Sequence, residues 1–235
     1  MRQQMTALAP DYRLRFADGV EICPAERMRP GPQSGTGIIT LAEDLRGQDL
    51  YLDLKLRPEF VHRLMTIVTD KTIRRLEGIR REHGYPAEGS FLNDDSAAGI
   101  SPRDYREFVL PYNQRFRSHL GGKCALHCCG PANHLVPFWT DDLRVDLLWN
   151  FSFETDRKLV ARRLGGKATL MGNVNWKLIT MGTPEEVHRD ATEVLETFDP
   201  LGGHILSTTN IAPGTPLENI NTMHAAAADF AAGER

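Results

Sequence analysis

The stretch that decides the fold is Lys123-Cys124-Ala125-Leu126-His127-Cys128-Cys129-Gly130. It is a short apolar run that ends at Gly130-Pro131, and it predicts a buried β-strand. Because successive side chains of a strand point to opposite faces, His127 and Cys129 share one face and Cys128 points to the other. Parallel α/β proteins keep their active sites at the carboxyl ends of strands, which is where this pair lies.

Two interpretations of this pair stand side by side. A neutral imidazole and a thiolate are ligands suited to Zn²⁺, so His127 and Cys129 are candidate metal ligands. Alternatively, the cysteines of this strand are core residues, since a free cysteine packs as a small hydrophobic side chain. The residues alone leave both open.

Composition restricts the class of protein. The chain has 235 residues, enough for one sizeable domain, with 41% hydrophobic and 25% charged residues. A formal net charge of −3 gives no reason to expect a nucleic-acid partner. No apolar run is long enough to span a bilayer, and the N-terminus resembles no signal peptide. Three of the four cysteines crowd into one strand, which argues against disulfides and predicts a reducing, cytoplasmic location.

Residues 38–235 alternate between short apolar runs and helical patterns, with Gly and polar residues where the runs end. This alternation predicts an α/β fold with a parallel sheet or barrel. Two helix starts carry clear capping signals, Asp156 and Thr183-Pro184-Glu185-Glu186. The expected strands, besides the one quoted above, are Ile38–Leu41, Ser90–Asn93, Asp146–Asn150, Ala168–Met171 and Gly203–Ser207.

Residues 1–37 form a separate, loop-rich N-terminal segment. Arg13–Phe16 and Val20–Ile22 alternate polar and apolar residues around Asp18-Gly19, which predicts a β-hairpin. The prolines and glycines that follow predict a connector without regular structure.

Asp94 and Asp95 follow the strand expected at Ser90–Asn93. At a strand end they are a candidate general-base or substrate-binding pair, and the alternative is a role in loop solvation or helix capping. A catalytic zinc usually has three protein ligands and one open position. The third ligand here is open among four residues: Asp94, Asp95, Glu154 and His204.

Asn150, Asn173 and Asn210 recur at the ends of successive expected strands. A single asparagine is common in turns. Three at corresponding places predict a polar mouth in which these amides bind substrate.

From Gly37 onward the chain resembles the uroporphyrinogen decarboxylase superfamily, whose members are (β/α) barrels. The resemblance therefore implies an α/β fold of the (β/α)8 TIM-barrel type for residues 38–235. The segments that carry it are Leu56-Arg57-Pro58-Glu59, Asn93-Asp94-Asp95, Tyr105 to Tyr112, Leu126-His127-Cys128-Cys129-Gly130, Leu170 to Val174, Gly182 to Glu186 and Pro213 to Ile220.

Within the superfamily, the His127-x-Cys129 signature resembles the methyltransferase branch. In that branch a zinc ion binds a thiol substrate, which takes a methyl group from a corrinoid protein. The resemblance implies Zn²⁺, a corrinoid cofactor, a small-molecule substrate and a corrinoid-protein partner here. Two alternatives remain: a metal-independent decarboxylase of a porphyrinogen-like carboxylated substrate, and a non-catalytic barrel that binds a corrinoid or a partner.

The chain departs from the family pattern in two ways. Members carry further barrel units before the region that matches Gly37, so we expect an incomplete or N-terminally shortened barrel. Open strand edges favour closure by a second copy, hence a homodimer. The methyltransferases also place a cysteine in the stretch matching Leu206 to Asn210, where this chain has none, and a neutral amide such as Asn210 is a poor zinc ligand.

Overall fold

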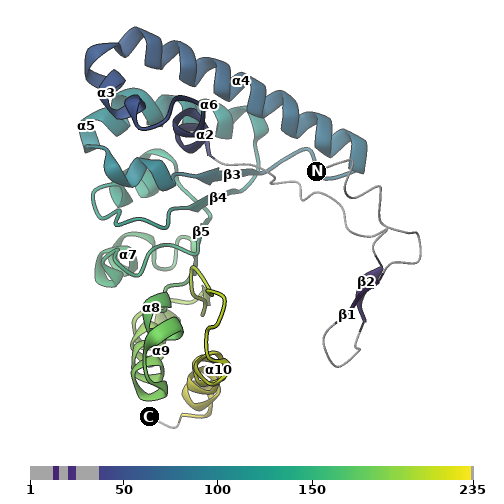
Figure 1. Cartoon of the computed structure of the whole chain (residues 1–235), viewed down its shortest axis with the longest axis vertical. Helices are drawn as coiled ribbons and strands as arrows, with labels where there is room; N and C mark the ends of the chain where they lie inside the picture. The colour runs from purple at the N-terminus through teal and green to yellow at the C-terminus, as the bar shows by residue number, and fades with distance from the viewer. Residues whose placement is uncertain (1–12, 16–20, 25–36, 234–235) are drawn as a thin grey trace.

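The computed structural model describes residues 13–15, 21–24 and 37–233 (Figure 1). Strands β1 (Arg13–Arg15) and β2 (Glu21–Pro24) pair in antiparallel fashion. The turn expected at Asp18-Gly19 and the connector up to residue 36 lie outside the described residues. The division of the chain into a segment 1–37 and a domain 38–235 stays a prediction.

The main sheet has five parallel strands that lie side by side in chain order. Parallel strands need a crossover between them, and here each crossover is helical or irregular chain that returns to the amino end of the next strand. Four of the five strands are shorter than the sequence suggested, and only Ser90–Asn93 keeps its expected bounds. Their bounds are β3 (Ser90–Asn93), β4 (Cys124–His127), β5 (Leu147–Trp149), β6 (Thr169–Met171) and β7 (His204–Ile205).

One face of this sheet is fully covered. Alternate strand residues point to that face, and four leucines form adjacent rungs of it. None of the four is more than 1% exposed: Leu92, Leu126, Leu148 and Leu170. They join one apolar cluster with residues of helices α4, α6, α7 and α9.

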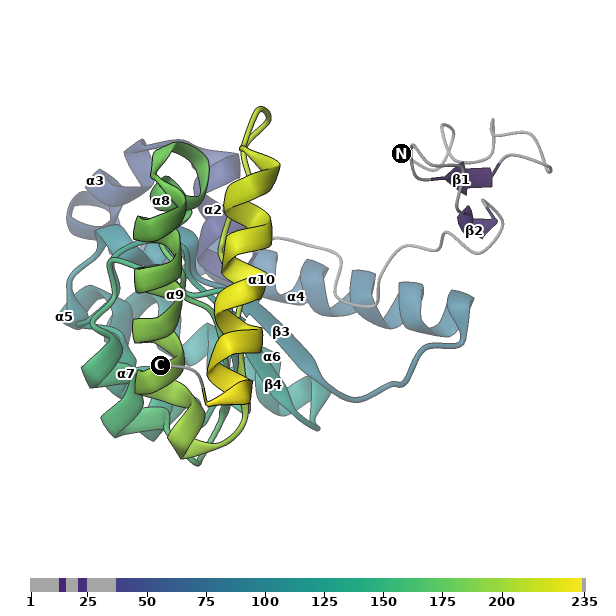
Figure 2. The same cartoon turned by 90° about the horizontal axis from the view of Figure 1, so that it is seen from below.

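The helices surround this covered face. Figure 2 shows α9 and α10 lying side by side, in agreement with their extensive packing. The expected capping signals at Asp156 and Thr183 are present, since both side chains accept backbone N–H groups of the first helical turn. The described residues form these α-helices of at least four residues: α2 (Ile38–Arg46), α3 (Asp49–Leu56), α4 (Pro58–His83), α6 (Leu110–Leu120), α7 (Arg157–Leu164), α8 (Trp176–Met181), α9 (Pro184–Phe198) and α10 (Leu217–Ala232).

The strand expected at Ile38–Leu41 is wrong, because these residues begin α2. Ile38, Ile39 and Ala42 are buried together, which a helix achieves by placing them on one side. The chain enters α2 against the end of β3: a Cβ added to Gly37 would lie 1.7 Å from the carbonyl oxygen of Asn93. Only glycine allows that approach.

A distorted helix packs beside β3. It runs through α5 (Pro102–Asp104), a π-helical turn η3 (Tyr105–Val109) and α6. Pro111 has no N–H to continue the regular pattern, which accounts for the irregularity of this helix. This helix presents Tyr105 and Asn113 to the protein interior behind the end of β3.

The segment from Ala132 to Trp139 is helical only in its second half. Turns occupy its first half, helical backbone begins at Val136 and Pro137, and a π-helical turn η4 (Phe138–Asp142) follows.

Candidate metal centre

Three side chains converge at the carboxyl ends of β3 and β4. Asp95 begins the 3-10 helix η2 (Asp95–Gly99) after β3, His127 ends β4, and Cys129 follows two residues later. One ligand atom from each lies within 4.8 Å of the other two. A carboxylate oxygen, an imidazole nitrogen and a sulfur are a donor set suited to zinc, and three such ligands leave one position open.

The orientation of His127 is set by the neighbouring strand. Its Nδ1 lies 2.9 Å from the carbonyl oxygen of Trp149. Because a carbonyl only accepts, Nδ1 carries the hydrogen and Nε2 of the neutral ring presents its lone pair. That Nε2 lies 3.4 Å from Oδ1 of Asp95, close enough for an ion pair when the ring is protonated. A metal cation shared by the two atoms would take the place of that proton, so the arrangement fits a metal.

Cys129 is tied to Asp95 directly. Its backbone N–H donates to Oδ1 of Asp95 at 2.7 Å. Partial burial of the sulfur raises the pKa of the Cys129 thiol to about 12. The hydrogen bond of the thiol to Asp95 and the negative charge of Asp95 raise the pKa as well. The thiol is thus protonated at neutral pH unless a positive charge is supplied, and a coordinated divalent cation supplies it.

A close backbone contact brings the two loops together. A Cβ added to Gly130 would lie 2.5 Å from Cβ of Ala98 in η2. The absence of a side chain at Gly130 lets the loop carrying Cys129 pack against the helix carrying Asp95.

The side chain of the preceding residue, Asp94, does not join the three candidate metal ligands. It is fully buried and accepts hydrogen bonds from the hydroxyl of Tyr105 at 2.7 Å and from Nδ2 of Asn113 at 2.9 Å. Burial raises its pKa to about 6, and these two hydrogen bonds oppose the rise. The expectation that Asp94 shares the mouth with Asp95 is wrong, because consecutive residues at a strand end point in opposite directions.

The three asparagines do not form one amide-lined mouth. Asn173 is buried and its side chain is occupied, donating to the carbonyl of Ser152 and accepting from Arg157. It is therefore a structural residue, which corrects its predicted role in substrate binding. Asn210 is exposed on the loop after β7. Asn150 has a positive φ of 46°, and its Oδ1 is buried without a hydrogen-bond partner among the described residues.

The other candidates for a third ligand are engaged elsewhere. Glu154 lies 4.0 Å from Nζ of Lys177, and Nε2 of His204 donates to the carbonyl of Gly172 at 2.7 Å. Cys124 and Cys128 are buried, and burial holds the pKa of the Cys128 thiol far above its ordinary range. The core interpretation thus fits these two cysteines, while Cys129 is exposed.

Comparisons with known proteins agree with this architecture. The family described as uroporphyrinogen decarboxylase (URO-D) matches residues 35–230. The chain belongs to the URO-D family. A solved structure described as a methyltransferase from Methanosarcina mazei superposes with a TM-score of 0.67 at 24% identity, covering 83% of this chain and 57% of that one. The predicted (β/α)8 TIM-barrel type of fold is confirmed, and the described residues hold five consecutive strands of it.

The relatives of this URO-D family chain include a methyltransferase and uroporphyrinogen decarboxylases. A methylated-thiol–coenzyme M methyltransferase from Methanosarcina mazei is 30% identical over 71% of this chain and 44% of its own length. A uroporphyrinogen decarboxylase from Syntrophotalea carbinolica is 31% identical over 69% of this chain and 46% of its own length. The chain thus spans less than half the length of either relative. The predicted resemblance to the superfamily and to its methyltransferase branch is confirmed.

Sequence reasoning missed the part of Trp149 in this URO-D family site. Its carbonyl orients His127, and its ring lies beside the imidazole. A backbone carbonyl carries no sequence signal, so only the pairing of β4 with β5 could reveal the contact. Among residues 37–233, no helix combines the length and apolar character that crossing a bilayer requires.

Proposed function

We propose that this chain belongs to a zinc-dependent methyltransferase, which moves a methyl group between a corrinoid carried by a partner protein and a small thiol. The observation that carries the proposal is the convergence of Asp95, His127 and Cys129 within 4.8 Å at the carboxyl ends of the strands. The methyltransferase relative supports the same class of reaction.

The three residues would hold the metal, with Asp95 in place of the cysteine that the family resemblance led us to expect near Asn210. Bound zinc would supply positive charge that stabilises a substrate thiolate at neutral pH. The carbonyl of Trp149 keeps the imidazole of His127 in the required tautomer. Gly130 holds Cys129 close to Asp95.

The substrate thiol would lose its proton to solvent, and its sulfur lone pair would form the new C–S bond to the methyl carbon. The corrinoid of the partner protein would supply the methyl group as a methyl-cation equivalent and would keep the electron pair of the bond that breaks. In the reverse direction a thioether would supply the methyl group to the corrinoid.

Metal analysis tests this proposal. We expect the purified protein to bind about one zinc ion per chain, and Cys129→Ala and His127→Ala to lose it, because two remaining ligands hold zinc poorly. Cys128→Ala is the matched control: it removes the adjacent thiol, which is buried on the other face, and should retain zinc. Zinc binding that survives Cys129→Ala, or no binding at all, would contradict the proposed mechanism.

A second candidate is a metal-independent decarboxylase of a porphyrinogen-like substrate. The 31% identical uroporphyrinogen decarboxylase favours it. Turnover of a tetrapyrrole carboxylate by metal-free protein would support this candidate, and methyl transfer from methylcobalamin to a thiol would support the first. A non-catalytic, corrinoid-binding barrel would bind the corrinoid and turn over neither substrate.

The predicted homodimer and cytoplasmic location belong to the same proposal. Within the described residues, β3 and β7 each have a strand on one side only, and Ile205 of β7 is 47% exposed. Such edges favour pairing with another chain. The mass of the native assembly measures whether a second copy is present.

A further inference from the structure

An aromatic wall stands directly beside the proposed metal ligands. The ring centroid of Trp149 lies 5.6 Å from that of His127 and 5.1 Å from that of Phe91. All three side chains point to the face of the sheet opposite the buried leucines. Trp149 is 36% exposed, which leaves part of its ring available to a ligand.

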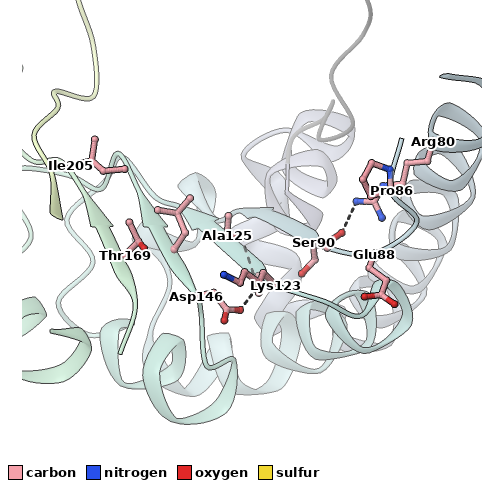
Figure 3. A pocket seen from close by; sticks show the side chains of 12 residues that line it. Arg80, Pro86, Glu88, Ser90, Lys123, Ala125, Asp146, Thr169 and Ile205 are labelled. Carbon is pink, nitrogen blue, oxygen red and sulfur yellow. Dashed lines mark hydrogen bonds between the residues drawn. The ribbon is translucent and has the colours of Figure 1, made fainter. Parts of the chain in front are cut away.

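The apolar character continues away from the metal ligands. Met171 is the partner of Trp149 on β6 at the same level of the sheet. One step toward the amino ends of the strands, the same face carries Ala125, Leu147 and Thr169, which line a separate hollow of about 460 Å³ (Figure 3). Charged residues also line that hollow, and neither Trp149 nor the metal ligands do, so it is not part of the aromatic wall: Arg80, Glu88, Lys123 and Asp146.

At the carboxyl ends of the strands, where the proposed metal ligands lie, the nearby charges are negative or already paired. No lysine or arginine occurs in β3–β7, and the acidic Asp95 and Glu154 follow two of these strands. Arg157, the first residue of α7, donates hydrogen bonds to the side chains of Asn173 and Asp190. Lys177, after β6, lies over the ring of Phe153 at 5.1 Å and near Glu154. At this end of the sheet the described residues therefore favour a neutral ligand over an anionic one.

From these observations, we propose that the thiol or thioether of this site has a neutral aromatic body, which packs against Trp149 while its sulfur reaches the metal ligands. The inference rests on the proposed methyltransferase function and names the substrate class of that site. Trp149 acts as a specificity-determining residue, because its ring contacts the body of the substrate rather than the transferred methyl group.

Calorimetric titration of the zinc-loaded protein with two alkyl thiols tests the inference. We expect benzyl mercaptan to bind about tenfold more tightly than the anionic 2-mercaptoethanesulfonate, because it buries a ring and brings no negative charge. Trp149→Leu should remove most of that difference, and Trp149→Phe should keep most of it. Trp176→Leu is the matched control, because Trp176 begins α8 and lies outside the wall, and it should change nothing.

A metal-free titration separates this inference from the proposed function. Benzyl methyl sulfide forms no thiolate, so it should quench tryptophan fluorescence in the zinc-free protein and fail to do so in Trp149→Leu. If zinc does not bind but this quenching occurs, the proposed function fails and the aromatic site stands. If zinc binds and 2-mercaptoethanesulfonate binds as tightly as benzyl mercaptan, the aromatic site is overturned and the proposed function stands.

Discussion

The two faces of the parallel sheet are built from alternate residues of the same short strands, yet they differ completely in environment. The covered face holds Leu92, Leu126 and Leu148, none of which is exposed. The opposite face carries His127 and the partly exposed Trp149 and Ile205. The difference teaches that one set of strand residues holds the fold together while the other is available for binding.

Asp94 and Asp95 show the same division within two residues. Asp94 continues the covered side and lies in a buried hydrogen-bond network with Tyr105 and Asn113. Asp95 continues the open side and faces His127 and Cys129. Identical side chains in adjacent positions thus belong to the buried core and to the candidate metal centre respectively.

Truncating one residue on each face tests whether the two faces differ in packing, and it should give the largest effect. Leu126→Ala leaves a cavity in the covered face and should lower the free energy of unfolding by about 3 kcal/mol. Thr169→Ala, on the open face, should cost less than about 1 kcal/mol, because little packing is lost. Urea denaturation measures both. Equal losses would show that the open face is packed as tightly as the covered one.

The two carboxylates provide the next test. Asp94→Ala leaves the buried Tyr105 hydroxyl and Asn113 amide without their acceptor and should cost about 2 kcal/mol of stability. Asp95→Ala should cost less than about 1 kcal/mol. It should, however, weaken zinc binding, which Asp94→Ala should affect less in protein that remains folded. A reversed pattern in denaturation and zinc titration would mean that the structural roles are exchanged.

A third substitution alters a residue that positions the proposed metal ligands without being one of them. Gly130→Ala forces the added Cβ against Ala98 and so displaces Cys129 from Asp95. We expect zinc affinity to fall about tenfold, as for the loss of a group that orients metal ligands. Gly78→Ala is a matched control, since an added Cβ there meets nothing within 4 Å. Unchanged zinc affinity in Gly130→Ala would show that the close contact does not hold the ligands together.

The smallest expected effect concerns pH. Burial lowers the pKa of His204, so the folded state resists protonation of this ring more than the unfolded state does. The contribution of His204 to stability should therefore decrease as the pH falls through the ordinary histidine range near about 6.5, whereas that of Asp94, whose pKa burial raises to about 6, should increase. Relative to wild type, the urea midpoint of His204→Gln should therefore rise on acidification across that range. A midpoint that falls relative to wild type would contradict the direction assigned to His204.

The sequence by itself determined the class of fold and the placement of His127 and Cys129 on one side of a strand end. Both follow from local rules: apolar runs alternate with capped helices, and strand side chains alternate with a period of two. The motif resemblance to the superfamily was equally visible in the residues. The mistaken strand at Ile38–Leu41 shows the limit of such rules, because a short apolar run fits a buried helix as well.

Only the tertiary structure decided that Asp95 lies against His127 and Cys129, and that the carbonyl of Trp149 orients His127. These facts depend on contacts between residues 22 or more positions apart, such as the hydrogen bond from His127 to the carbonyl of Trp149. Strand pairing and loop packing create those contacts only when the whole sheet has assembled. Local residue patterns carry no information about such distances, which is why the sequence left the third ligand open.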